Sequence, residues 1–266
     1  LTFSPLQPML SGAPVIRHGC RTPGDPYPSL NLSIHRTGAI VLAQLYPFSV
    51  NYLTNPDQQT LRSLALEHTP AVFESRHGNL VKVSRNKARQ AKFTYVIADD
   101  GPERFSQKTI TRAEALPLIA RQQKYIEAQG QLIEVQGFLG TGPRAVGVQW
   151  LYTVEGANIA GMQSVLAFPV DSVLNDSEHF SPEFRVVYTP NCFAYGMPGD
   201  QAIIVDLENY TTYIMGPDYF GESKKAALRM LNERVYQSGG LVLHAGAKKV
   251  KIGDKTVAMT IMGLSG

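Results

Sequence analysis

The feature that most constrains the fold of this chain is a series of β-type segments between residues 131 and 216, with few helical stretches between them. Each segment is short and rich in β-branched and aromatic residues, as is typical of strands. The segments read QLIEVQGFLG, VGVQWLYTVEG, FRVVYTP, QAIIVDLEN and YTTYIMG. Upstream, NLVKVSR and KFTYVIADD alternate apolar and polar residues and are also predicted to be strands. This pattern predicts a mixed α/β or α+β sheet rather than a helical bundle or a doubly wound sheet.

Three helices are predicted around these strands. Residues 55–68 begin with Asn-Pro, which favours a helix start. Residues 111–130 begin with a capping box, Thr111 with Glu114. A third helix follows YFGE and ends at the glycine pair that starts with Gly239. Two further strands, LVLHAG and VAMTIMG, are predicted after it.

Composition and charge exclude several functional classes. A net charge of +3 over 266 residues, with Lys and Arg scattered, does not indicate a nucleic-acid-binding surface. No apolar stretch reaches the roughly 18 residues that span a bilayer, so no membrane association is expected. Cys20 and Cys192 lie far apart in the chain and fit a reducing compartment, so we expect a cytoplasmic protein. The first 35 or so residues are rich in proline and glycine and are predicted to be irregular.

The most informative chemistry lies in the last fifty residues. Lys224 and Lys225 fall in the first turn of the third helix, where the helix dipole disfavours cations and an anion nearby would offset the cost. His244 lies in an apolar segment, where a lone histidine is ordinarily a hydrogen-bonded core residue. The terminal GLSG, from Gly263 to Gly266, supplies only the first four of the eight positions of a P-loop motif. By itself it indicates no more than a glycine turn.

Together, these pieces resemble the phosphoenolpyruvate carboxykinase family, and specifically its ATP-dependent branch. The motif Tyr-x-Gly-Glu-x-Lys-Lys of that family is similar to the segment from Tyr219 to Lys225, and its histidine nineteen residues later matches His244. A strand then leads into GLSG, as in the family's phosphate loop. The resemblance covers about residues 78–266. It implies a carboxykinase-type N-terminal, substrate-side domain over residues 1–215 and the first strands of a nucleotide-binding P-loop domain over residues 216–266.

The resemblance also implies roles for individual residues. Lys225 and His244 are expected to bind Mn²⁺, with or without Mg²⁺, and Lys225 can do so only as the neutral amine, so its pKa must be low. Tyr219 is expected to lie against the substrate, which would be oxaloacetate or phosphoenolpyruvate. Gly263, Ser265 and Gly266 would begin the loop that holds the phosphates of ATP. The reaction implied is the conversion of oxaloacetate and ATP to phosphoenolpyruvate, carbon dioxide and ADP, with this chain alone inactive.

One departure from the family concerns the substrate-binding arginine. Counting back from Tyr95 places Arg89 at that arginine, but Ala88 replaces a glycine and Gln90-Ala91 replaces Ser-Pro. Arg85 is an alternative, and Arg89 could equally be a solvated surface residue. Two non-catalytic readings therefore stand beside the enzyme: a diverged sensor of a dicarboxylate or nucleotide, and an interaction domain. The sequence does not specify an oligomeric state.

Overall fold

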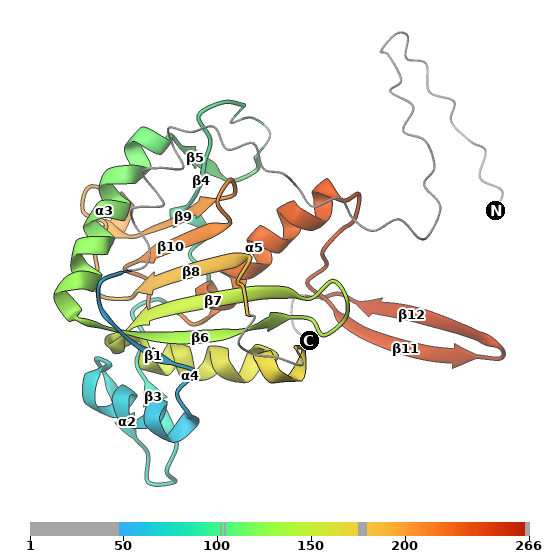
Figure 1. The fold of residues 1–266 in the computed structure, drawn as a ribbon, viewed down its shortest axis with the longest axis horizontal. Coiled ribbons are helices and arrows are strands. Elements are labelled where there is room, and N and C mark those ends of the chain that lie inside the picture. The colour runs from blue at the N-terminus through green and yellow to red at the C-terminus, as the bar shows by residue number, and fades with distance from the viewer. Residues whose placement is uncertain (1–47, 102, 104, 175–179, 264–266) are drawn as a thin grey trace. The chain divides into compact units, whose positions relative to one another are not determined.

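The computed structural model describes residues 48–101, 103, 105–174 and 180–263, which belong to one compact unit. Its centre is an eight-stranded sheet with the order β1-β6-β7-β8-β10-β9-β4-β5 (Figure 1). The strands are β1 (Asn51–Thr54), β4 (Thr94–Ile97), β5 (Lys108–Ile110), β6 (Gln131–Leu139), β7 (Val146–Thr153), β8 (Phe184–Thr189), β9 (Ala202–Asp206) and β10 (Thr211–Met215). The pairs β6–β7 and β9–β10 are antiparallel, and the other five neighbouring pairs are parallel. This confirms the predicted mixed sheet.

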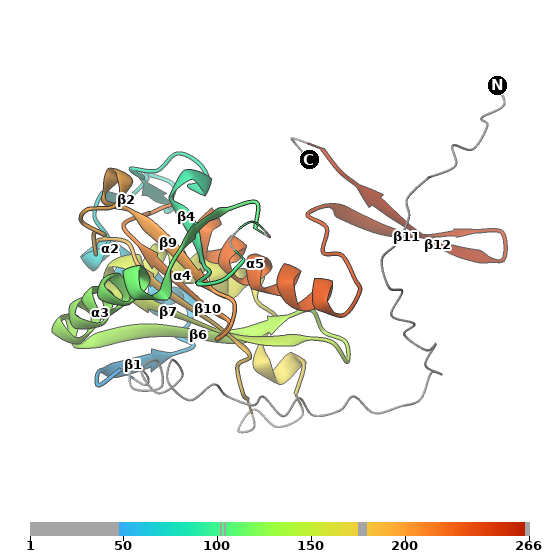
Figure 2. The same ribbon diagram turned by 90° about the horizontal axis from the view of Figure 1, so that it is seen from above.

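Helices cover both faces of this sheet (Figures 1 and 2). Helix α3 (Arg112–Gln129) contributes Ala115, Ile119 and Ile126 to the core on one face. The opposite face is covered by α2 (Gln58–His68), α4 (Ala157–Leu166) and α5 (Gly221–Gln237). With helices on both sides, successive residues of a central strand are buried on alternate faces, which explains why these strands are apolar almost throughout.

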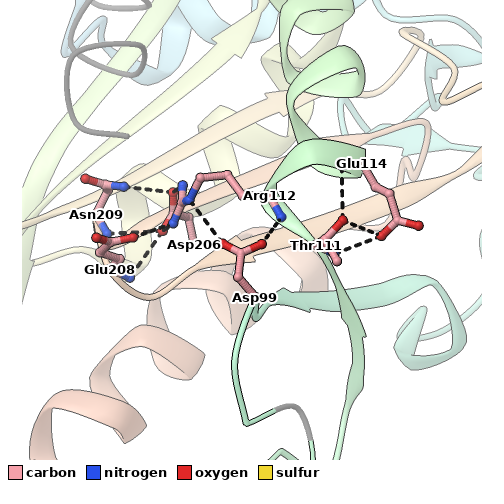
Figure 3. A network of polar contacts seen from close by, with 7 residues as sticks. All are labelled: Asp99, Thr111, Arg112, Glu114, Asp206, Glu208 and Asn209. Carbon is pink, nitrogen blue, oxygen red and sulfur yellow. Dashed lines mark hydrogen bonds and ion pairs between the residues drawn. The ribbon is translucent and has the colours of Figure 1, made fainter. Parts of the chain in front are cut away.

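The start of α3 shows how local sequence fixes an element. Thr111 Oγ1 accepts a hydrogen bond from Glu114 N, and Glu114 Oε2 accepts one from Thr111 N at 2.9 Å, so the predicted capping box is confirmed. The next residue, Arg112, forms ion pairs with three acidic side chains (Figure 3): Asp99, Asp206 and Glu208. This network joins the start of α3 to the turn between β9 and β10, and its Asp206 is fully buried.

Two smaller hairpins form sheets of their own, separate from the main sheet. β2 (Val72–Glu74) pairs with β3 (Leu80–Lys82), so the predicted strand NLVKVSR contributes β3 to this hairpin and is not part of the large sheet. β11 (Gly246–Ile252) pairs with β12 (Lys255–Ile261), and the two pair with no other strand of the described chain. Apolar side chains on this hairpin are exposed, including Ile252, Met259 and Ile261.

Two predictions about elements need correction, and helix α4 was missed. The segment LVLHAG is not a strand: residues 241–245 have no strand partner, and β11 begins only at Gly246. Helix α4 was not predicted, because its sequence ANIAGMQSVL contains a central glycine and lacks a clear polar face. Helix α2 begins at Gln58 behind the cap Asp57, slightly later than Asn55. The predicted irregular segment over the first 35 residues lies outside the described residues.

The predicted domain boundary near Gly216 stays a prediction. Helix α5 follows that residue and packs against the same core as α2 and α4. Of the described helices, none combines the length and the apolar character that crossing a membrane requires.

Candidate active site

Four of the residues singled out by the sequence, Arg89, Tyr219, Lys225 and His244, lie around the N-terminal part of α5. Tyr219, half-buried, lies immediately before the helix. Its ring lies over Gly221, where an added Cβ would be only 2.3 Å from Tyr219 Cε1. The backbone carbonyl of Tyr219 accepts hydrogen bonds from the buried Tyr188 hydroxyl at 3.0 Å and from Glu222 N at 3.0 Å. Because Gly221 has no side chain, it leaves room for the ring of Tyr219.

Two buried side chains fix the first turn of α5. Glu222 is fully buried, and its carboxylate accepts hydrogen bonds from Gln90 N at 2.5 Å and from Arg229 Nη2 at 2.9 Å. Ser223 Oγ lies 2.6 Å from the Tyr152 hydroxyl and donates to Gln163 Oε1 at 2.9 Å. The Glu222 carboxylate thus joins α5 to a loop 132 residues earlier in the chain.

The loop held by Glu222 carries Arg89. Its side chain is exposed, and within the described part of the chain its guanidinium has no hydrogen-bond partner. Arg89 is nevertheless close enough to Lys225 for its charge to lower the pKa of that lysine. Arg89 therefore has a guanidinium that is available for a ligand beside the predicted metal-binding lysine.

Arg85, the alternative to Arg89, is engaged by the protein itself. Its Nη2 donates to the carbonyls of Pro190 at 2.6 Å and Gly216 at 3.2 Å, and to Asn191 Oδ1 at 3.1 Å. Its Nε lies 3.5 Å from Asp218 Oδ2. A guanidinium with these partners holds the loop in place, which favours Arg89 over Arg85 as the ligand-binding arginine.

Asp218 attaches the Arg89 loop to the segment before α5 at a second place, in addition to the contact between Glu222 and Gln90. The buried carboxylate accepts hydrogen bonds from Arg85 N and Asn86 N, while Asp218 N donates to Asn86 Oδ1. Burial acts to raise the pKa of Asp218, but these backbone donors and the charges of Lys82 and Arg85 outweigh it and lower the pKa. The sequence reading missed Asp218, although its position directly before Tyr219 was a usable signal.

Gly216 permits the close approach of this segment to the neighbouring turn. Its φ is +93°, and an added Cβ would lie 3.1 Å from the Asp200 carbonyl oxygen. Both the backbone conformation and the contact exclude a larger residue without strain.

A cavity of about 200 Å³ adjoins Arg85 and Asp218. Tyr219, Lys225 and His244 are outside its wall.

Lys225 and His244 lie in direct contact. Lys225 Nζ is 2.9 Å from His244 Nδ1, across nineteen residues of sequence. Lys225 is partly buried on α5, whereas His244 is exposed in the extended segment before β11, not in a strand. The pKa of Lys225 lies below its ordinary value, chiefly because of burial. Three positive charges act in the same direction: Lys224, Arg89 and Arg229.

The donor chemistry of this pair fits a metal such as Mn²⁺ only in part. A neutral amine and an imidazole are both nitrogen ligands that Mn²⁺ accepts, and the lowered pKa of Lys225 favours the neutral amine. The direct contact between the two nitrogens must open for both to bind one ion. Within the described residues there is no cluster of three or more His, Cys, Asp or Glu side chains that could hold a metal.

Of the glycine-rich terminus, only Gly263 is among the described residues. Gly263 is exposed after the end of β12, while Ser265 and Gly266 lie outside the described residues. Their predicted contact with ATP phosphates therefore stays a prediction.

Comparison with known proteins supports the motif-based reading. A sequence model of the family described as phosphoenolpyruvate carboxykinase, of the ATP type, matches residues 50–266. A relative from Geobacillus thermodenitrificans, named phosphoenolpyruvate carboxykinase (ATP), is 31% identical over 147 residues, which are 53% of this chain and 26% of the relative. Proteins of the same name from Mesorhizobium japonicum and Brevibacillus brevis are 34% and 35% identical over 91 and 88 residues. Those two matches cover 33% and 32% of this chain and 16% of each relative.

The matched stretches thus span about a quarter or less of the length of these relatives. The family model, in contrast, covers well over half of the chain and includes Arg89, Tyr219, Lys225 and His244. On this basis the chain belongs to the ATP-dependent phosphoenolpyruvate carboxykinase family.

Proposed function

We propose that this chain forms the substrate- and metal-binding part of an enzyme that converts oxaloacetate and ATP to phosphoenolpyruvate, carbon dioxide and ADP. The observation that carries the proposal is the convergence of Arg89, Lys225 and His244 from separate segments on helix α5, which Tyr219 precedes. An exposed arginine and an exposed histidine without a shared function would not require this arrangement.

The proposed site combines a group for an anionic substrate with two nitrogen ligands. The free guanidinium of Arg89 would bind a carboxylate of oxaloacetate through paired hydrogen bonds. The Tyr219 ring, held over Gly221, would lie against the substrate and restrict its orientation. Glu222 would keep Arg89 at the correct distance from α5 through the Gln90 backbone.

Lys225 and His244 would hold the divalent cation. When bound, the cation supplies positive charge that stabilises an enolate oxygen and a phosphoryl group. In the proposed reaction, the carbon–carbon bond to the departing carboxylate breaks and its electron pair forms the enolate. The enolate oxygen then bonds to the γ-phosphorus as the bond between that phosphorus and ADP breaks. Lys225 takes part as the neutral amine, so its proton must leave before the cation binds.

The proposed mechanism needs further groups besides Arg89, Tyr219, Lys225 and His244. The family resemblance implies a phosphate-binding lysine and an aspartate as third metal ligand, for which the motifs matched in this sequence supply no residue. We therefore expect the isolated chain to bind the cation and the dicarboxylate without turnover. Measurable phosphoenolpyruvate formation by the isolated chain would contradict this part of the proposal.

The proposed activity is tested in the complete gene product by Mn²⁺-dependent exchange of labelled carbon dioxide into oxaloacetate. We expect exchange in the wild type and a loss of at least tenfold in kcat/KM for Arg89→Gln. Arg76→Gln is a matched control, because Arg76 is an exposed arginine in the turn between β2 and β3. Absence of exchange in the complete wild-type protein, with oxaloacetate binding retained, would instead support the sensor.

A further inference from the structure

The loop that carries Arg89 is attached to the start of α5 at two places with matching spacing. Asn86 N donates to Asp218 Oδ1 at 3.0 Å, and Gln90 N donates to Glu222 Oε1 at 2.5 Å. Each contact joins residues that are 132 positions apart in the chain. The loop therefore runs alongside the segment that leads into α5, in the same chain direction, and is held on both sides of its arginine.

Asn86 makes the first of these attachments with its side chain as well as its backbone. The residue is buried, and its Oδ1 accepts a hydrogen bond from Asp218 N at 3.1 Å, so the contact with Asp218 is reciprocal. Its Nδ2 donates to Gln201 Oε1 at 3.1 Å, directly before β9. Both polar atoms of this side chain are thus bonded within the protein, and they fix the loop from two directions.

Gln90 adds a contact within the loop itself. Its Nε2 donates to the Ala88 carbonyl oxygen at 2.5 Å, so this hydrogen bond spans Arg89. Ala88 and Gln90 are two of the positions at which the chain departs from the family pattern, which has glycine and serine there. A side-chain hydrogen bond therefore restricts the backbone of this chain on either side of Arg89.

The residues between the two attachments are exposed: Lys87, Ala88 and Arg89. A long, exposed side chain such as that of Arg89 loses conformational freedom when it binds a ligand. A backbone that is fixed on both sides limits the region that the guanidinium can reach, and so reduces this loss. The attachments thus affect ligand affinity without touching the ligand.

We propose that Asn86 and Gln90 are positioning residues for Arg89, which hold its guanidinium where a carboxylate of the substrate can bind beside α5. This inference rests on the proposed function, in which Arg89 binds the dicarboxylate. It assigns the shape of the binding loop to two amide side chains, at positions that a glycine and a proline do not stiffen in this chain.

The test is a double-mutant cycle on the 266-residue chain, with succinate as an unreactive dicarboxylate probe. Its affinity is measured by NMR titration, on signals of the folded chain, so a loss of stability alone does not alter the result. We expect Arg89→Gln to weaken succinate binding about tenfold and Asn86→Ala about fivefold. Because Asn86 acts through Arg89, the double variant should bind no more than about twofold more weakly than Arg89→Gln alone.

A second cycle uses Gln90→Ala, which is milder because Gln90 is only half-buried and its backbone contact with Glu222 stays. It should weaken succinate binding about threefold, and again add little to Arg89→Gln. Asn209→Ala is the matched control. Asn209 also hydrogen-bonds to a buried aspartate, Asp206, but belongs to the network at the start of α3 (Figure 3). It should leave the affinity for succinate unchanged.

The outcomes separate this inference from the proposed function. Unchanged affinity in Asn86→Ala and Gln90→Ala, with a loss in Arg89→Gln, would overturn the positioning role and leave the proposed function standing. So would effects that multiply, with the Asn86 and Arg89 double variant about fiftyfold weaker than the wild type. A wild type that does not bind succinate, or an unchanged affinity in Arg89→Gln, would contradict the proposed function and this inference with it.

Discussion

Lys225 Nζ and His244 Nδ1 lie 2.9 Å apart, one on a helix and the other on the extended segment that follows it. The contact places an amine with a lowered pKa next to an imidazole at the N-terminal part of α5. Glu222 brings the Arg89 loop to the same place. The arrangement is that of a nitrogen-donor pair beside an arginine that is free to bind an anion.

The lowered pKa of Lys225 is directly testable by chemical labelling. Only the neutral amine reacts with acetic anhydride, so the labelling rate of each lysine rises as pH passes its pKa. We expect the midpoint for Lys225, measured by peptide mass spectrometry, to lie at lower pH than that of a lysine model compound, N-acetyl-lysine amide, in the same solution. Each rate is normalised to its own plateau, so partial burial does not affect the midpoint. Coincident midpoints would contradict the charge environment described for Lys225.

Replacing Glu222 tests how the Arg89 loop is attached to α5. Glu222→Gln leaves Arg229 buried without its anionic partner, and removing one member of a buried pair typically costs about 3–5 kcal/mol. We expect a loss of about 3 kcal/mol or more in the free energy of unfolding, measured with urea. Glu127→Gln on the exposed face of α3 should change it by less than about 0.5 kcal/mol. Equal effects would show that Glu222 does not hold the loop.

Two helical glycines form a matched pair for testing the support of Tyr219. An added Cβ at Gly221 would be 2.3 Å from Tyr219 Cε1, whereas at Gly161 in α4 its nearest neighbours are 3.7 Å away. Gly221→Ala should destabilise the fold by about 1–3 kcal/mol, because the ring must move. Gly161→Ala should be neutral or stabilising by up to about 1 kcal/mol, owing to helix propensity. Thermal unfolding of both variants gives the comparison, and a stabilised Gly221→Ala would be inconsistent with the ring position.

The buried tyrosines predict a fall in stability at alkaline pH. Burial raises the pKa of both Tyr152 and Tyr188 above the ordinary value of about 10. The native state therefore keeps these protons where the unfolded chain releases them. Their stabilising effect is complete below about pH 10 and is lost as pH rises from there toward the raised pKa of the folded state.

Urea unfolding between pH 9 and pH 11 measures this dependence. Tyr188→Phe should make the decline shallower by up to about 1.4 kcal/mol per pH unit, which corresponds to one proton. It also removes the hydrogen bond from Tyr188 to the Tyr219 carbonyl, worth about 0.5–1.5 kcal/mol at all pH values. An unchanged slope in Tyr188→Phe would show that this hydroxyl does not stay protonated.

Local sequence patterns predicted those parts of the fold that depend on local forces. The capping box at Thr111, six of the eight strands of the large sheet (β4 and β6 to β10) and helix α5 follow from patterning and end signals, whereas the short strands β1 and β5 were not predicted. Helix α4 was not predicted, because a short helix that is apolar around much of its surface resembles a buried strand. The prediction of a strand at LVLHAG was wrong for the opposite reason. Its pattern suits a strand, but in the described structure no other strand pairs with it.

Only part of the candidate site could be predicted from local sequence patterns. Motif spacing indicated Tyr219, Lys225 and His244, since these residues lie close together in the chain. The Glu222–Gln90 contact joins residues 132 positions apart, and neither residue carries a local signal of the other. The same applies to the choice between Arg85 and Arg89, which depends on the carbonyl groups that surround Arg85.

The most direct measurement of the central claim is a Mn²⁺ titration of the chain, followed by electron paramagnetic resonance of the free ion. We expect one site in the wild type, with affinity that rises with pH as Lys225 loses its proton. Lys225→Met and His244→Gln should each weaken binding at least tenfold, whereas Lys248→Met on the hairpin should leave it unchanged. Mn²⁺ binding that is the same in all four proteins would contradict the assignment of Lys225 and His244 as a metal-binding pair.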